Sequence, residues 1–231
     1  MKYLIFGAVI FALCLFSCHH GNEHKESKVK VSAIKANTTE TSQSSGTSND
    51  KQEIQDLIRK VLNWSDKKGS FDLLPTLTDT KDSIFVGFDM EKLKVNLEKL
   101  KATNFFSSGF VENYNQIILT LDKGLRTNEY GKWSTGELPN FGFANDASPW
   151  CLCQDVPYDK PNPWDLVEVQ IINLDKEKGE LHWTWGNPEL NGSPDWKDFT
   201  YKFGVEKENG KWRISYLQGF DFKEGTRKDG I

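Results

Sequence analysis

Apolar residues in the first half of the chain recur every three or four positions, the spacing of one face of an α-helix. Three segments show this spacing, and each predicts an amphipathic helix. The first covers about 52–65 behind Asp50, which forms a capping box with Glu53. The second follows Asp89 as a predicted N-cap, and the third ends near Gly124, a residue suited to a left-handed C-terminal position. The apolar positions are Ile54, Leu57, Ile58, Val61 and Leu62, then Leu93, Leu97 and Leu100, then Phe110, Tyr114, Ile117, Ile118 and Leu121.

The second half of the chain changes to the period of two that is typical of strands. Residues 165–174 predict one strand, and in 180–185 apolar and polar side chains alternate. Two further alternating runs are joined by Asn209-Gly210, the preferred pair for a two-residue type I′ turn. This turn predicts a β-hairpin near the end of the chain.

The predicted turn also sets the register of the hairpin, because a two-residue loop determines which positions face each other. We expect Val205 opposite Ile214 and Phe203 opposite Tyr216 on one face, and Glu206 opposite Arg213 on the other. Helices followed by an antiparallel meander define an α+β fold in a single domain.

The segments "IQDLIRKVLNW" and "VEKENGKWRISYLQGFD" are similar to those of the nuclear transport factor two-like (cystatin-like) superfamily. More narrowly, the chain resembles the lipoprotein-borne domains of unknown function in this superfamily found in Bacteroidetes. The resemblance covers about 52–222 and implies N-terminal helices packed on a curved, cone-like antiparallel sheet. A long insert rich in Pro and Trp at 131–164 departs from the pattern. Because the superfamily includes enzymes, ligand binders and interaction modules, the fold alone gives no function.

The sequence predicts a targeting signal at the N-terminus. Lys2 precedes an apolar run that is too short to span a bilayer and has the length of a signal-peptide core. The run ends in Leu-Phe-Ser-Cys, which resembles the lipobox of bacterial lipoproteins and implies cleavage after residue 17 and lipidation of Cys18. We therefore expect a signal peptide at 1–17 and a membrane anchor at Cys18. The alternative is an ordinary secreted protein, whose signal peptide is cleaved nearby without lipidation.

Residues 18–50 follow as a tether to a domain at 51–231. Residues 37–50 contain eight Ser or Thr and no apolar residue, so they cannot bury enough surface to offset their ordering entropy. His19, His20 and His24 could hold a metal, but a polar leader explains them as well. The formal net charge of −4 argues against nucleic-acid binding, which normally needs a basic surface.

Cys151 and Cys153 are the two cysteines of the predicted domain. In an extended strand their Cα atoms would lie about 6.6 Å apart, near the upper limit for a disulfide, so a bridge needs a local bend. A bridge, two packed thiols, a redox pair and a zinc site with His182 and Asp155 are the alternatives. The context favours a structural role, and we predict no metal and no cofactor.

Four tryptophans, Trp133, Trp150, Trp164 and Trp196, fall in predicted loops, where aromatic rings with Asp155 suit a binding surface. The same rings could instead close one end of the core. Asp146, Asp155 and His182 could serve a pocket enzyme, but Asp in loops is usually explained by turns and caps.

The sequence favours a membrane-anchored lipoprotein of the bacterial cell envelope, on the outer membrane or facing the periplasm. Its domain would bind an unknown protein or small molecule without catalysis, for example as an immunity or inhibitor protein. A glycan-binding accessory lipoprotein and a small pocket enzyme are the alternatives.

Replacement of Cys18 tests the predicted membrane localisation. Wild-type protein should incorporate labelled fatty acid and partition with membranes, because two or more acyl chains anchor a protein stably. Cys18→Ala should lose both properties. Unchanged membrane partitioning of the variant would contradict a lipid anchor at this residue.

Overall fold

The computed structural model describes residues 48–67, 71–157, 162–186 and 195–228. Contacts divide the chain into two units, Met1–Thr41 and Ser42–Ile231, and every described residue belongs to the second. Cys18 and the predicted signal and most of the tether thus lie outside the described residues. No described helix combines the length and the apolar run needed to cross a membrane.

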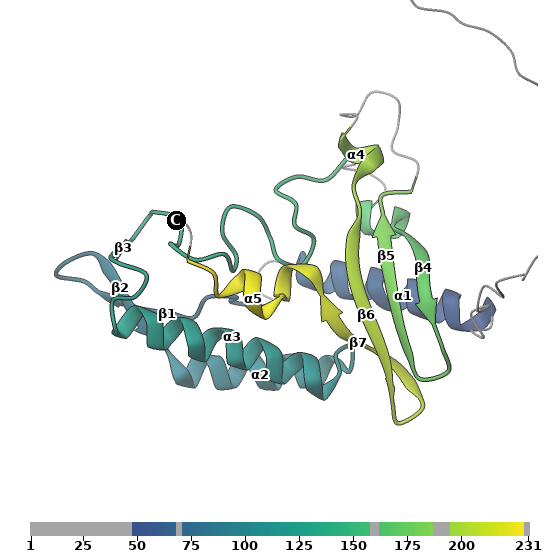
Figure 1. Cartoon of the computed structure of the whole chain (residues 1–231), viewed down its shortest axis with the longest axis horizontal. Coiled ribbons are helices and arrows are strands. Elements are labelled where there is room, and N and C mark those ends of the chain that lie inside the picture. The colour runs from purple at the N-terminus through teal and green to yellow at the C-terminus, as the bar shows by residue number, and fades with distance from the viewer. Residues whose placement is uncertain (1–47, 68–70, 158–161, 187–194, 229–231) are drawn as a thin grey trace, which may run out of the picture. The chain divides into compact units, whose positions relative to one another are not determined.

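The described residues form an α+β domain, as the sequence predicts (Figure 1). Its long helices are α1 (Ser48–Ser65), α2 (Met90–Thr103) and α3 (Ser108–Arg126). All apolar positions predicted for the first and third helices are buried, so the helical pattern is confirmed. Short helical turns complete the domain: η1 (Pro163–Leu166), α4 (Asp195–Asp198), η2 (Gln218–Phe220) and α5 (Phe222–Gly225).

The helix ends agree only in part with the predictions. Asp89 is the N-cap of α2 and accepts from the backbone N–H groups of Glu91 and Lys92, as predicted. By contrast, α1 begins at Ser48, so Asp50 lies in its first turn and is not the N-cap. Gly124 lies inside α3, where a Cβ atom would come within 2.1 Å of the Tyr130 ring. Close packing explains this glycine, and the predicted left-handed cap is wrong.

Four antiparallel strands form the larger sheet in the order β4-β5-β6-β7. They are β4 (Glu168–Leu174), β5 (Lys178–Thr184), β6 (Tyr201–Glu208) and β7 (Lys211–Leu217). Helix α1 packs on one face of this sheet, where Arg59 Nε donates to the Val167 carbonyl at 2.9 Å. The buried side chains of the strands point toward α1, and the alternate positions face solvent.

The last hairpin has the predicted turn but only part of the predicted register. Asn209 and Gly210 have φ values of 54° and 73°, the positive values that a type I′ turn requires. Val205 lies opposite Ile214, and Glu206 opposite Arg213, as predicted. Beyond them Ser215 is bulged out of the ladder, so Phe203 faces Leu217 and the predicted pairing of Phe203 with Tyr216 is wrong.

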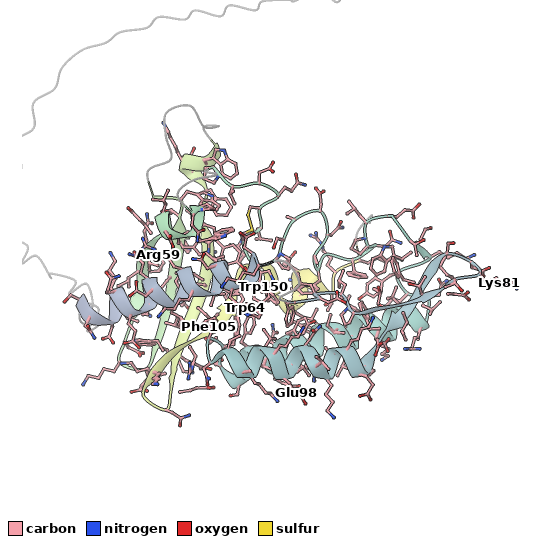
Figure 2. The ribbon with its side chains drawn as sticks, turned by 180° about the vertical axis from the view of Figure 1, so that it is seen from behind. Arg59, Trp64, Lys81, Glu98, Phe105 and Trp150 are labelled. Atoms are coloured by element: carbon pink, nitrogen blue, oxygen red, sulfur yellow. A yellow bond between two sulfur atoms is a disulfide. The ribbon has the colours of Figure 1, made fainter. Side chains whose placement is uncertain are left out.

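A second, three-stranded sheet was not predicted from the sequence. It has the order β1-β2-β3 and consists of β1 (Thr76–Asp79), β2 (Ile84–Phe88) and β3 (Trp133–Ser134). The backbone N–H of Phe88 donates to Asp122 Oδ1 of α3 at 2.7 Å, which holds β2 against that helix. Lys81 lies at the tip of the β1–β2 hairpin, at the end of the domain opposite to α1 (Figure 2).

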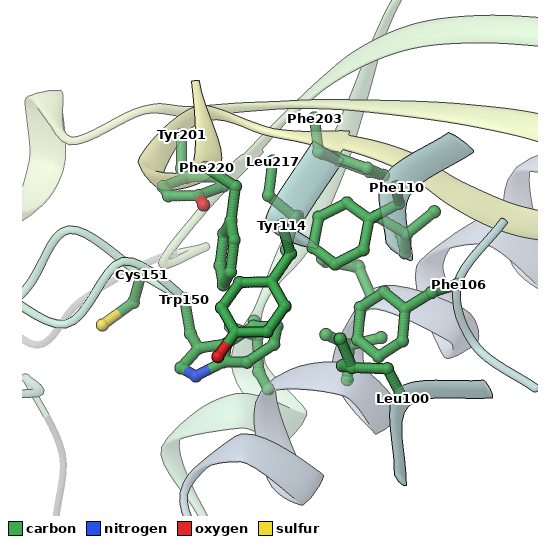
Figure 3. Close-up of a cluster of buried hydrophobic side chains, with 14 of the residues drawn as sticks. Leu100, Phe106, Phe110, Tyr114, Trp150, Cys151, Tyr201, Phe203, Leu217 and Phe220 are labelled. Atoms are coloured by element: carbon green, nitrogen blue, oxygen red, sulfur yellow. The ribbon is translucent and has the colours of Figure 1, made fainter. Parts of the chain in front are cut away.

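The core joins segments that are distant in the sequence through aromatic rings (Figure 3). Trp150 is central: its ring lies 5.6 Å from Trp64 at the end of α1, 5.8 Å from Phe106 and 4.6 Å from Phe220. Figure 2 shows Trp64 and Trp150 side by side. The segment around Trp150 is therefore part of the core, although the sequence presented it as an insert.

Asp50 ties the start of α1 to the last hairpin. Its Oδ1 accepts from Trp212 Nε1 at 2.9 Å and from Lys207 Nζ at 3.3 Å. The Lys207 ammonium also lies 4.4 Å above the Trp212 ring, a cation–π distance.

Substitution of Gly210 tests the turn. A β-branched residue is strained at the positive φ of this position, so Gly210→Val should lower the free energy of unfolding by about 1 kcal/mol or more. Gly210→Asn is the matched control and should cost less, because Asn tolerates the left-handed region. Thermal denaturation measures both. Equal melting temperatures for Val, Asn and wild type would contradict the assignment.

Candidate binding groove on the four-stranded sheet

The solvent face of the larger sheet holds a groove of 840 Å³. Strand pairing aligns two rows of outward positions across it. One row contains His182 and Lys202, with Gln170 beside His182 but outside the lining, and the other contains Glu180 and Gly204. The groove is lined by Ile172, Asn173, Asp175, Lys178, Gly179, Glu180, Leu181, His182, Lys202, Phe203, Gly204, Val205, Glu206, Ser215 and Tyr216.

The groove is deep at Gly204, because this residue contributes no side chain in the middle of the sheet. A Cβ atom at this position would lie 3.1 Å from Ser215 Oγ and 3.1 Å from Tyr216 Cβ, which is tighter than ordinary packing. The bulge at Ser215 brings these two atoms toward the glycine. Glycine and bulge thus shape the groove together.

Two apolar side chains border the floor on opposite strands. Ile172, on the edge strand β4, is 58% exposed, and Tyr216, on β7, is 37% exposed. Tyr216 Oη donates to Asp221 Oδ2 at 3.3 Å. Partial burial raises the pKa of Tyr216, and the negative charge of Asp221 raises it further. Tyr216 therefore stays a neutral phenol at neutral pH and can offer its ring face to a ligand.

Charged groups of both signs surround this apolar centre. Lys178 Nζ lies 3.9 Å from Glu206 Oε2 across β5 and β6. Asp175 accepts from the backbone N–H groups of Glu177 and Lys178, both at 2.7 Å, and these bonds lower its pKa below the usual value. Glu180 and Lys202 point outward from neighbouring strands. The site can therefore make apolar contacts at its centre and ion pairs at its rim.

The groups predicted for a pocket enzyme are not brought together. His182 lies in the groove, whereas Asp146 and Asp155 are exposed on the loop that precedes Val156 and do not line it. Within the described ranges no three His, Cys, Asp or Glu side chains converge as a metal site. His19, His20 and His24 lie outside these ranges.

The predicted tryptophan surface is wrong for three of its four indoles. Trp133, Trp150 and Trp164 are each 4% exposed. Trp133 packs on Phe85 with ring centroids 4.2 Å apart and donates through Nε1 to the Glu137 carbonyl. Trp133 lies in β3, Trp164 in η1 and Trp150 in the disulfide loop, and all three rings fill the interior because these segments are packed into the core.

Trp196 is partly buried and packs edge-on against Trp185, with ring centroids 5.9 Å apart. It belongs to an aromatic cluster at one end of the larger sheet, formed by Trp164, Trp183, Trp185, Trp196, Phe199 and Tyr201. The indole N–H groups of Trp164, Trp183 and Trp185 are buried in this cluster without a hydrogen-bond partner. Of the predicted binding residues, only Asp155 is fully at the surface.

Cys151 and Cys153 form a disulfide with Cα atoms 5.1 Å apart. The required bend comes from Leu152, whose φ is 51°, and from a turn in which the N–H groups of Cys151 and Leu152 donate to the Ser148 carbonyl.

The loop that carries the disulfide is fastened to the sheet by Tyr201. The buried Tyr201 hydroxyl donates to the Pro149 carbonyl at 2.7 Å and accepts from the Gly219 N–H at 3.0 Å. Burial raises the pKa of Tyr201, so this hydroxyl keeps its proton and remains a donor.

The groove was not predicted from the sequence, although the sequence contains two signals for it. Gly204 interrupts an otherwise alternating strand, and a glycine inside a strand often marks a bulge or a close approach. The outward positions of β5 and β6 carry Glu180, His182 and Lys202, which is a charged set for one face of a sheet.

Comparisons of the chain with protein-family models, with curated proteins and with solved structures give no match.

Paired substitutions at two tyrosines test the fastening of the disulfide loop. Tyr201→Phe leaves a buried carbonyl and a buried N–H unpaired, so it should lower the free energy of unfolding by about 2 kcal/mol. Tyr216→Phe, the control, removes a hydroxyl at the surface and should change stability by about 0.5 kcal/mol or less. Equal denaturation midpoints for the two variants would contradict a structural role for the Tyr201 hydroxyl.

Proposed function

We propose that the protein is a lipid-anchored lipoprotein of the bacterial cell envelope whose domain binds a partner polypeptide in this groove, without catalysis at that site. The observation that carries the binding role is the groove on the solvent face of the four-stranded sheet. The anchor rests on the lipobox-like sequence that ends at Cys18. Binding of a toxin or hydrolase that the protein neutralises would fit the same arrangement.

The composition of the groove supports a polypeptide partner. Protein interfaces combine an apolar centre with a polar rim, and aromatic residues are enriched at their centres. Here Ile172 and Tyr216 are the exposed apolar groups, and the rim carries Glu180, Lys202 and the Lys178–Glu206 pair. Charges of both signs favour a partner that itself carries both signs.

The dimensions of the groove suit a protruding loop or an extended segment. The lining part of β5 runs from Lys178 to His182, which is about 13 Å at the rise of a strand. Four strands at their usual spacing add about 14 Å across. This footprint is smaller than the surface that each partner buries in a stable complex, about 800 Å². We therefore expect further contacts around the groove.

A glycan is the weaker candidate for this site. Sugar recognition was predicted from the loop tryptophans, and Trp133, Trp150 and Trp164 are buried. Ile172 at the groove also offers no polar group to a saccharide hydroxyl. Of the two aromatic rings in the groove lining, Phe203 is 2% exposed, which leaves Tyr216 to stack on a sugar.

Site-specific photocrosslinking tests the proposal in the full-length protein. A benzophenone amino acid at Ile172 should form a defined crosslink to another polypeptide in intact cells, because this position borders the groove. The control carries the same probe at Val95, which is 49% exposed on α2. Mass spectrometry of the adducts identifies the partner.

A charge reversal at the rim adds a second criterion. Glu180→Arg in the probe-bearing chain should reduce the crosslink at Ile172 by about tenfold, since a rim charge complementary to the partner becomes repulsive. Its melting temperature should stay within the range of surface substitutions. Identical adducts at Ile172 and Val95, or no adduct at Ile172, would refute binding in the groove.

A further inference from the structure

The two sulfur atoms of the Cys151–Cys153 disulfide lie in different environments. Cys151 is 4% exposed and belongs to the core, whereas Cys153 is partly exposed. Figure 3 shows the Cys151 Sγ atom pointing away from the aromatic rings and toward the loop. Because Cys153 is the more exposed of the two residues, we expect a thiol from solvent to attack its sulfur.

The bridge contributes little to holding the domain together. A cross-link that closes a loop of only three residues removes little entropy from the unfolded chain. The same loop is held by contacts that do not involve sulfur: the Trp150 ring packs in the core, and Tyr201 Oη donates to the Pro149 carbonyl. Opening the disulfide should leave these contacts in place.

The residue between the cysteines favours opening. Leu152 has a φ of 51°, in a region that is unfavourable for a residue with a Cβ atom. Its side chain is 40% exposed at the tip of the loop, where it can contact an incoming polypeptide. Exposed or strained disulfides are the labile, regulatory or catalytic ones.

We propose that Cys151 and Cys153 form a thiol–disulfide exchange site that oxidises dithiols of other polypeptides. This activity is separate from the groove and does not depend on a partner bound there. The signal peptide predicted from the sequence would place it in an oxidising compartment, where such a disulfide persists.

The reaction balances as two consecutive exchanges. A substrate thiolate attacks Cys153 Sγ, the S–S bond breaks, and Cys151 leaves as a thiolate that takes up a proton. The second substrate thiolate then attacks the substrate sulfur of the mixed disulfide and expels the Cys153 thiolate, which is protonated in turn. The substrate loses two electrons and becomes a disulfide. A small-molecule disulfide such as oxidised glutathione restores the Cys151–Cys153 bond and is itself reduced to two thiols.

Oxidation of a model dithiol tests the activity with the full-length protein. A reduced synthetic peptide with two cysteines is incubated with oxidised glutathione, and its disulfide is followed by mass spectrometry. Catalytic amounts of the protein should accelerate peptide oxidation by at least about tenfold over glutathione alone. Cys153→Ser should abolish the acceleration. All variants carry Cys14→Ala and Cys18→Ala, which excludes a contribution of the two N-terminal thiols.

Two single-cysteine variants then identify the attacked sulfur. Cys151→Ser should accumulate a glutathione adduct on Cys153, whereas Cys153→Ser should label Cys151 at least about tenfold more slowly because that residue is buried. Circular dichroism should show the same melting behaviour for both variants and for the reduced wild type. No acceleration of peptide oxidation, preferential labelling of Cys151, or unfolding on reduction would each overturn the proposal.

Leu152→Gly provides an independent measurement on a chain that keeps both cysteines. Glycine adopts a positive φ without steric cost, so the bridged form should become more stable relative to the dithiol. Titration against a glutathione buffer should show a shift of at least about threefold in the equilibrium constant toward the disulfide. An unchanged constant would contradict the role of Leu152 in favouring opening.

Discussion

The rest of the domain depends on the contacts that the buried Trp150 ring makes in the core. This ring meets Trp64 from α1, Phe71 from the following loop, and Phe220 from the end of the chain. Helix α1 covers the larger sheet, so the ring fixes the helix, the sheet and the disulfide loop relative to each other. A single aromatic side chain from a loop thus closes the core that the helices and strands leave open.

The sequence predicted the elements whose signal is local. Each long helix has a repeat of apolar residues, and the last hairpin has Asn209-Gly210, whose geometry requires no distant contact. The smaller sheet was missed because its strands are short, and β3 has only two residues. The register of Tyr216 was predicted wrongly because the bulge at Ser215 interrupts the ladder, and alternation of apolar and polar residues gives no signal for it.

The candidate sites depended still more on tertiary structure. Tryptophans in loops suggested a surface, but loop position does not determine burial, and Trp150 and Trp164 became core residues. The groove, in turn, exists because strands that are distant in the sequence align Glu180 with Gly204. The cysteine pair was visible in the sequence, yet the contrast between a buried Cys151 and a partly exposed Cys153 depends on how the loop is held against the sheet.

The contact of Asp50 with Trp212 and Lys207 has a mechanical consequence. A pulling force on the segment before α1 reaches the domain at the first turn of this helix and meets these bonds before it meets the core. These hydrogen bonds link the first turn of α1 directly to the last hairpin, so the force is shared between a helix and a sheet. The apolar contacts of α1, which begin at Ile54, lie behind this junction and would be loaded only after it gives way.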